Sequence, residues 1–244
     1  MSDNPPPSVP AAARALLRAA DRAALATHHA ATGQPYVSLV GLATDLAGAP
    51  ILLLSELAEH SRGIARNPQV SLLIDGTGRH ANPQAGPRLT LMGRLDRVSD
   101  EIAARRFLAR HPGASRYAGF ADFAFYRLTA QRAQLIGGFG RANWFVPTPA
   151  LDEGAAAAMA AGMAAFLDDI NLCRDGLPLR LAQVCLRRRP TAAHMVAVDP
   201  DGCDLALGRG SGRRRRVVFT APAASLDAID RTLLAMLSGN SRCN

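Results

Sequence analysis

Lysine is absent from this sequence of 244 residues, and all 28 of its Lys-or-Arg positions are arginine. Alanine and glycine are abundant as well, so a biased coding composition explains much of the formal net charge of +8. Aromatic residues make up only 5% of the chain, too few for the stacking platforms that hold single-stranded nucleic acid. We therefore expect no nucleic-acid partner, and we interpret the runs Arg187–Arg189 and Arg213–Arg216 as solvated loops.

Cysteine and long apolar runs are also scarce. The four cysteines form no CxxC pair, which argues against a zinc site or a redox pair, and we expect free thiols. No apolar run approaches the ~20 residues that a membrane helix needs. The start, MSDNPPPSVP, lacks the basic segment and apolar core of a signal peptide. These absences predict a cytoplasmic protein with no membrane partner.

What remains is the composition of an ordinary globular protein, with 48% hydrophobic and 20% charged residues in a chain long enough to bury a core. Residues 1–150 show short apolar strands joined by hairpins, with helices inserted between them. This order predicts an antiparallel sheet that closes into a barrel. After a Pro-Thr-Pro linker, residues 151–244 predict a smaller α/β domain with an alanine-rich helix and a closing helix. The predicted fold class is therefore α+β.

One short helix of the first domain has the composition of an anion site. In LLLSELAEHSRGIARNPQVSLLID, residues 52–75, a strand ends at Ser55 and a helix then begins with His60, Ser61 and Arg62. Free backbone N–H groups at a helix start attract anions, and an arginine can bind phosphate through two hydrogen bonds. The alternative is structural, with Ser61 capping the helix and Arg62 solvated.

Four stretches of the first domain resemble the FMN-binding split barrels of the pyridoxamine 5'-phosphate oxidase family, and most closely their heme-iron utilisation branch. They are LLLSELAEHSRGI, PRLTLMGRLDRV, YAGFADFAFYRL and AQLIGGFGRANWF, which together cover most of residues 25–146. The resemblance implies an antiparallel split β-barrel of the FMN-binding type. It also implies a homodimer, because those barrels place the flavin between two subunits.

The resemblance further implies roles for individual residues. Relatives hold the FMN phosphate with a Ser-Arg-Lys at the start of the short helix; here Ser61 and Arg62 match, but Gly63 replaces the lysine. Arg88 falls where relatives place a polar residue that reaches the flavin, and Arg141 is the counterpart of a late arginine near the cofactor pocket. The predicted cofactor-binding residues are Ser55, His60, Ser61, Arg62, Arg88 and Arg141.

The second domain departs from the heme-utilisation branch. There a helix usually carries a His-Met-Asn-x-Asp-His pattern, whose side chains can meet heme iron, and the equivalent stretch here is Asp-Ile-Asn-Leu-Cys-Arg. Asn171 is kept, whereas Asp169 and Arg174 replace the two histidines. A thiolate at Cys173 can in principle ligate heme, and the alternative is an inert, buried cysteine.

Three hypotheses stay open. The first is an FMN-dependent oxidoreductase that acts as a homodimer on an unknown small-molecule substrate. The second is a protein that binds or degrades heme, against which the lost histidines weigh. The third is a non-enzymatic regulator whose cofactor pocket has decayed. Because the sequence has no GxSxG, HExxH or P-loop motif, any chemistry would belong to the cofactor, and we expect no separate metal site.

Overall fold

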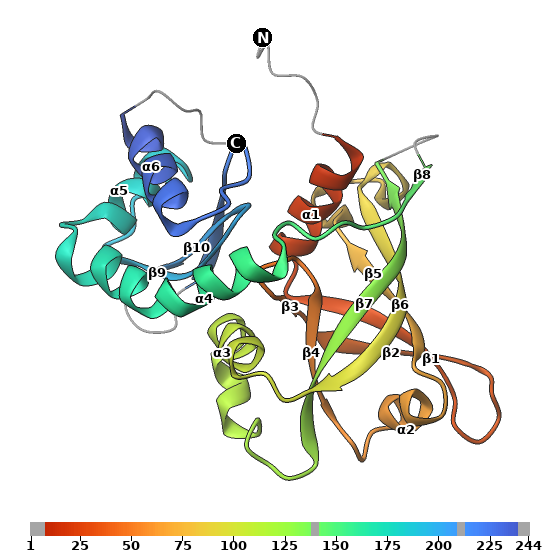
Figure 1. The fold of residues 1–244 in the computed structure, drawn as a ribbon. Helices are drawn as coiled ribbons and strands as arrows, with labels where there is room; N and C mark the ends of the chain where they lie inside the picture. The colour runs from red at the N-terminus through yellow and green to blue at the C-terminus, as the bar shows by residue number, and fades with distance from the viewer. Residues whose placement is uncertain (1–7, 138–141, 209–212, 239–244) are drawn as a thin grey trace. The chain divides into compact units, whose positions relative to one another are not determined.

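The computed structural model describes residues 8–137, 142–208 and 213–238. The chain forms two compact units, Met1–Thr148 and Pro149–Asn244, and their boundary falls in the Pro-Thr-Pro segment. Figure 1 colours the first unit from red to green and the second from blue-green to blue.

Alternating apolar and polar residues form the strands of the first unit, because successive side chains of a strand point to opposite faces. In β1, Arg22–His28, every second residue is buried, beginning with Ala23. In β4, Pro50–Ser55, all residues but the last are buried. The other strands are β2 (Pro35–Gly41), β3 (Ala43–Thr44), β5 (Gln69–Asp75), β6 (Arg88–Val98), β7 (Phe123–Ile136) and β8 (Ala142–Phe145).

These strands form one antiparallel sheet in the order β2-β1-β5-β6-β7-β4-β3, with β8 paired to β7. The two longest strands, β6 and β7, pair from Arg88 opposite Ile136 to Val98 opposite Phe125, with a register shift after Met92. The sheet curls around an apolar core that includes Leu25, Leu52, Leu72, Ile74, Leu89, Leu95 and Leu128. The predicted α+β fold, built on an antiparallel curled half-barrel, is confirmed.

Helices cover the ends of the barrel. In α1, Val9–Ala19, the buried Arg18 donates from Nη1 to Thr44 Oγ1 at 2.9 Å, which ties the helix to β3. Helix α3, Glu101–Arg110, begins at Asp100, whose carboxylate accepts from two backbone N–H groups of the first turn. The remaining helices of this unit are α2 (Glu59–Arg66) and the 3-10 turns Thr77–Arg79, Pro83–Ala85 and Pro112–Arg116.

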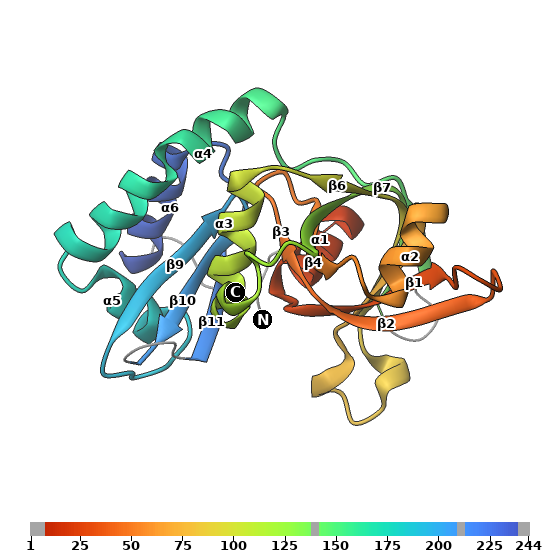
Figure 2. The ribbon, with the colours of Figure 1, turned by 90° about the horizontal axis from the view of Figure 1, so that it is seen from below.

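In its described residues, the small second unit has three α-helices on one face of a three-stranded sheet (Figure 2). Its helix α4, Glu153–Asp168, continues into a π-helical turn, Asp169–Cys173. The other elements are α5 (Leu177–Val184), β9 (Ala193–Asp199), β10 (Gly202–Leu207), β11 (Arg213–Val218) and α6 (Leu226–Leu237). The sheet order is β11-β10-β9.

Three expectations about this unit need correction. The run Arg213–Arg216 is not a loop, because it opens β11 and pairs with β10. Cys173 and Cys203 are free, but Cys185 is disulfide-bonded, so the expectation of free thiols is wrong for Cys185. Among the described residues, the continuous helix Glu153–Cys173 is long and apolar enough to cross a membrane by length and composition alone. The expectation that no such run exists was too strict.

Candidate functional site

Helix α2 lies beside strands β1 and β2 of the barrel (Figures 1 and 2). No described side chain caps its first turn, and the N-cap position is Ala58, with extended backbone angles of φ −73° and ψ 148°. An uncapped helix start presents backbone N–H donors and the positive end of the helix dipole. This end of α2 is therefore suited to binding an anion.

Buried polar atoms surround this helix start. Ser61 is only 6% exposed, and its Oγ has no hydrogen-bond partner among the described residues. The same holds for Nε2 of His60 and for Oγ1 of Thr27, which faces α2 from β1. A buried polar group without a partner costs about 1–3 kcal/mol. Ser61 stands in the first turn of α2, where side chains tilt toward the N-terminus, so its unpartnered hydroxyl is available to a ligand near the uncapped end.

His60 contributes a hydrogen-bonding atom to the site rather than a charge. Its Nδ1 lies 3.2 Å from Oγ of Ser38 on β2. Burial lowers the pKa of His60 below its ordinary value of 6.5, so the imidazole is neutral at pH 7.

Arg62 supplies the cation of the first turn, but its charge is shared. Its side chain is 61% exposed, and Nη1 lies 3.4 Å from Oε2 of Glu59. The other carboxylate oxygen of Glu59 lies 3.3 Å from Nε2 of His29. Nδ1 of His29 lies 3.3 Å from the backbone N of Thr32 and 3.1 Å from its Oγ1, which holds the ring in place. Glu59 therefore balances the charge of Arg62 at the start of α2.

Gly63 packs directly against β1. A Cβ built on Gly63 would lie 2.2 Å from the carbonyl oxygen of His28 and 3.5 Å from Oγ1 of Thr27. No side chain fits at 2.2 Å from a backbone atom, so a lysine cannot stand here without moving the helix. The missing third residue of the Ser-Arg-Lys pattern is a consequence of this close packing.

Ser55 is engaged in local structure. Its Oγ donates to Oδ2 of Asp122 at 2.6 Å and accepts from the backbone N–H of Leu57 at 3.2 Å. The backbone N–H of Glu56 also donates to the carbonyl of Asp122. These bonds fix the turn that leads from β4 into α2, so Ser55 positions the site.

Arg88 stands at the opposite end of β7 from Ser55. Its guanidinium donates to the carbonyls of Gln84 and Gly86, which holds the loop between β5 and β6. Arg88 pairs with the last residue of β7, whereas Ser55 pairs with Phe123, the first. At ~3.3 Å per residue, about 40 Å of strand separates the two ends. That Ser55, Ser61 and Arg88 border one cavity stays a prediction.

The last predicted residue, Arg141, lies outside the described residues. A cavity of about 250 Å³ lies at the start of α3, next to the end of β6 and the start of β7, and is lined in part by Ser99, Asp100 and Phe125. None of the described predicted residues lines it. This cavity is separate from the start of α2.

Sequence reasoning missed three members of the site. Glu59 is the acid that binds Arg62, while Thr27 and Ser38 come from neighbouring strands. An acidic residue two places before a Ser-Arg pair was a usable signal, because acids are favoured in the first turn of a helix. Nothing in the local sequence singles out Thr27 or Ser38, since only the pairing of β1 with β2 brings them to α2.

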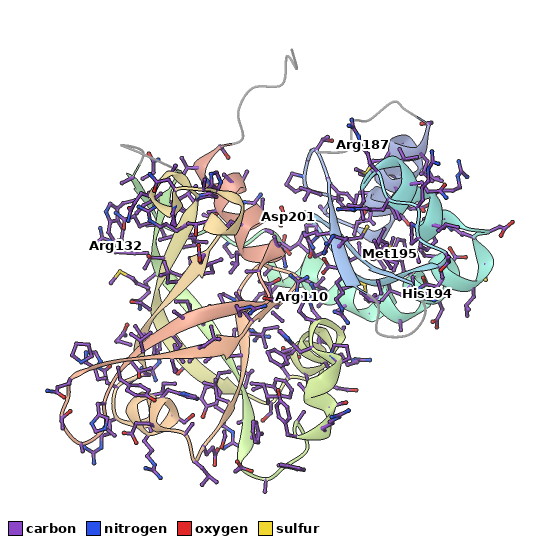
Figure 3. The ribbon with its side chains drawn as sticks, turned by 180° about the vertical axis from the view of Figure 1, so that it is seen from behind. Arg110, Arg132, Arg187, His194, Met195 and Asp201 are labelled. Carbon is purple, nitrogen blue, oxygen red and sulfur yellow. The ribbon has the colours of Figure 1, made fainter. Side chains whose placement is uncertain are left out.

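The outer face of the barrel sheet is apolar and exposed. Cross-strand partners share a face, so the pairings define two adjacent rows of side chains. The first row is Leu39, Ala24, Leu73, Thr90, Gln134 and Trp144, and the second is Val37, Ala26, Ser71, Met92 and Arg132. Leu39 is 72% exposed and Val37 63%. The charged member, Arg132, lies 4.8 Å from the ring centre of Trp144 at the outer surface (Figure 3).

The π-helical turn of the small domain is held by its own polar residues. The side-chain amide of Asn171 donates to the carbonyl of Met195, a β9 residue labelled in Figure 3, and accepts from the backbone N–H of Met195. Nε of Arg174 lies 2.7 Å from Oδ2 of Asp169, and its Nη1 pairs with Asp230 on α6. The two positions expected to carry histidines thus form an ion pair. Cys173 is exposed, so the alternative of a buried cysteine is wrong.

Comparison with known proteins agrees with this architecture. The family model described as CREG, beta-barrel matches residues 5–150. The chain belongs to the CREG beta-barrel family. It is 38% identical over 113 residues to "Non-canonical heme oxygenase HOZ, chloroplastic" of Arabidopsis thaliana. That match covers 45% of this chain and 34% of HOZ, so the chain spans about a third of the length of this relative.

Two solved structures resemble nearly the whole chain. The protein Atu2129 from Agrobacterium tumefaciens str. C58, of unknown function, is 26% identical with a TM-score of 0.75, covering 96% of this chain and 97% of its own. A heme binding protein from Mycobacterium smegmatis is 27% identical with a TM-score of 0.55, covering 97% and 98%. The finer resemblance to an FMN-binding branch stays a prediction.

The two groups suggested by the resemblance, FMN and heme, fit this CREG beta-barrel protein differently. The start of α2 offers one shared arginine, a buried hydroxyl and free N–H groups, which suit a singly charged carboxylate better than a phosphate dianion. In the π-helical turn, Asp169 and Arg174 are bound to each other, which leaves the exposed Cys173 as the remaining candidate ligand for heme iron there. Among the described residues, no group of three or more His, Cys, Asp or Glu side chains could hold a metal ion.

Proposed function

We propose that this protein binds heme as cargo or substrate, with a heme propionate held at the start of α2. The observation that carries the proposal is that Glu59 balances the charge of Arg62 at that helix start. The N–H groups, Ser61 and Arg62 would bind the carboxylate, and neutral His60 would supply a further hydrogen bond. The names of HOZ and of the Mycobacterium smegmatis protein support heme as the ligand.

The proposal includes a homodimer. The apolar rows on the outer face of the sheet are suited to packing against a second copy, because contiguous exposed apolar surface marks interaction sites. Arg88 shares this face, since it stands two residues before Thr90 on β6. A two-fold axis running across the strands would bring opposite strand ends together, so Arg88 of the partner subunit could complete the site. We keep the cytoplasm as the proposed location.

The second candidate is an FMN-dependent oxidoreductase acting on a small molecule. It is favoured by Ser61 and Arg62, which stand at an uncapped helix start in the order that the FMN-binding relatives use. When bound, FMN would supply the redox chemistry, and this chain would contribute hydrogen bonds and charge at the phosphate. The absent third cation and the acid at position 59 count against it. A protein that binds neither group would instead fit the non-enzymatic regulator.

The experiment is a titration of the purified protein with hemin and, separately, with FMN, followed by absorption. We expect a Soret band that saturates with hemin. Arg62→Ala should weaken hemin binding about tenfold, at the low end for hydrogen bonds to charged groups. The matched control is Arg105→Ala, which removes a similarly exposed arginine from α3. Loss of the Soret band on adding ascorbate in air would assign degradation as well as binding.

Each outcome selects one candidate. A protein that does not bind hemin but gives a saturating flavin spectrum would replace heme with FMN. Equal losses of hemin affinity in Arg62→Ala and Arg105→Ala would show that α2 is not part of the binding site, while heme would remain the ligand. A protein whose spectra show no saturable binding of either hemin or FMN would contradict both proposals.

A further inference from the structure

Glu59 stands between two cationic or proton-donating side chains at the start of α2. One carboxylate oxygen is 3.3 Å from Nε2 of His29, in the loop after β1, and the other is 3.4 Å from Nη1 of Arg62. Thr32 fixes the ring of His29 from the other side through Nδ1. Glu59 is therefore held in place, with its side chain only 27% exposed.

The position of Glu59 matters because its negative charge lies in the same positive field that would attract an incoming anion to the start of α2. A carboxylate in the first turn of a helix is stabilised by the positive end of the dipole and by the free N–H groups. Any anion that binds there meets the charge of Glu59. It also meets an Arg62 whose charge Glu59 has already balanced.

An independent observation supports a ligand at this end. The hydroxyl of Ser61 is buried and has no partner among the described residues, although it lies in the first turn and leans toward the helix start. Glu59 does not meet this need, because its carboxylate oxygens contact His29 and Arg62. The start of α2 thus combines a hydroxyl donor without an acceptor, on Ser61, with the fixed negative charge of Glu59, which repels anionic ligands.

We propose that Glu59 is the specificity-determining residue of the α2 site, admitting singly charged carboxylates and disfavouring phosphate dianions. This inference rests on the proposed function in that the same helix start is the anion site. Coulomb repulsion grows in proportion to the charge of the ligand. Removing the charge of Glu59 therefore multiplies the affinity for a dianion by the square of the factor for a monoanion at the same distance.

The test is Glu59→Gln, which keeps the size of the side chain and removes its charge. One unit charge at a helix start is worth about threefold in affinity, so FMN should bind about tenfold more tightly to the variant and hemin about threefold. Riboflavin lacks the phosphate, and its affinity should not change. The matched control is Glu101→Gln, which removes an exposed first-turn glutamate from α3, away from the site.

The outcomes separate this inference from the proposed function. If wild-type protein fails to bind hemin but Glu59→Gln gains FMN affinity and not riboflavin affinity, heme is the wrong ligand and the inference stands. If hemin binds and Glu59→Gln changes FMN and riboflavin equally, the inference is wrong and the heme proposal stands. FMN binding that is undetectable in both wild type and Glu59→Gln also overturns the inference. An equal gain of FMN affinity in Glu101→Gln does the same. Circular dichroism of each variant verifies that the fold is kept.

Discussion

The carbonyl oxygen of His28 occupies the space next to Gly63 in which the Cβ of any other residue at position 63 would lie. A helix this close to β1 leaves no room for a Cβ at position 63. This contact holds the uncapped start of α2 against the strand that carries Thr27. The geometry of the candidate site thus depends on one glycine.

Gly63→Ala should destabilise the protein by about 1–3 kcal/mol, the usual cost of forcing extra atoms into a packed region. The loss should appear as a lower urea midpoint with an unchanged slope, because the unfolded state is barely altered. The matched control is Gly78→Ala, since a Cβ at Gly78 would meet nothing within 4 Å. Equal midpoints for Gly63→Ala and wild type would show that α2 can shift away from β1 without cost.

Asn171 should matter for the stability of the small domain rather than for ligand binding. Its amide makes two hydrogen bonds with the backbone of Met195, at 2.9 and 2.8 Å, on the strand at one edge of the sheet. Asn171→Ala would leave both backbone groups without these partners, so we expect a loss of about 1–3 kcal/mol in the free energy of unfolding. Gln183→Ala, on the exposed side of α5, is the control. A variant that keeps its stability but loses the Soret band with hemin would instead assign Asn171 to the ligand.

The pH dependence of stability should include a contribution from Asp100. Burial raises the pKa of Asp100, but hydrogen bonds from Arg127 and from the backbone N–H groups of Ala103 and Ile102 outweigh it, so the pKa lies below its ordinary value of 3.8. The folded state thus favours the carboxylate. The stabilisation is present above the ordinary pKa and is lost as the pH falls through the lower folded-state pKa.

Two substitutions at Asp100 separate the cap from the charge. Asp100→Asn keeps an oxygen that can cap α3 but removes the charge facing Arg127, whereas Asp100→Ala removes both and should cost about 1 kcal/mol more. Urea unfolding at pH 7 and at about pH 3 should show that the difference in unfolding free energy between wild type and Asp100→Asn is smaller at the lower pH. A difference that is the same at both values would exclude the charge as its cause.

The fold was predictable because its signals are local. The alternation in RLTLMGRLDRV predicts β6, and Asn67-Pro68 ends α2 where expected, because the position before proline disfavours helix. The run Arg213–Arg216 was misjudged for a reason that is not local. It is a strand because it pairs with β10, and Arg216 is held by Asp199 at 2.6 Å.

The candidate site was only partly predictable, because its decisive contacts join distant segments. Ser61 and Arg62 were found from their order in the chain. The pairing of Glu59 with His29 spans 30 residues, and the obstruction of Gly63 by His28 depends on how closely a helix meets a strand. Neither is encoded in any short motif. Arg88 was assigned to the same pocket from the resemblance alone, and that assignment stays a prediction.

The proposed homodimer leads to the last prediction. Leu39 and Leu73 lie in one row of the outer sheet face, bridged by Ala24 on β1. Burying an unpaired carboxylate among apolar side chains is strongly unfavourable, so Leu39→Glu or Leu73→Glu should shift the protein from dimer to monomer in sedimentation velocity at micromolar concentration. Leu172→Glu is the matched control, since Leu172 is 81% exposed on the π-helical turn of the other unit. A monomeric wild type, or a dimer that survives both substitutions on the sheet face, would contradict this interface. If Arg88 of the partner subunit completes the site, the monomeric variants should also lose hemin affinity while keeping the helix and strand content of the wild type.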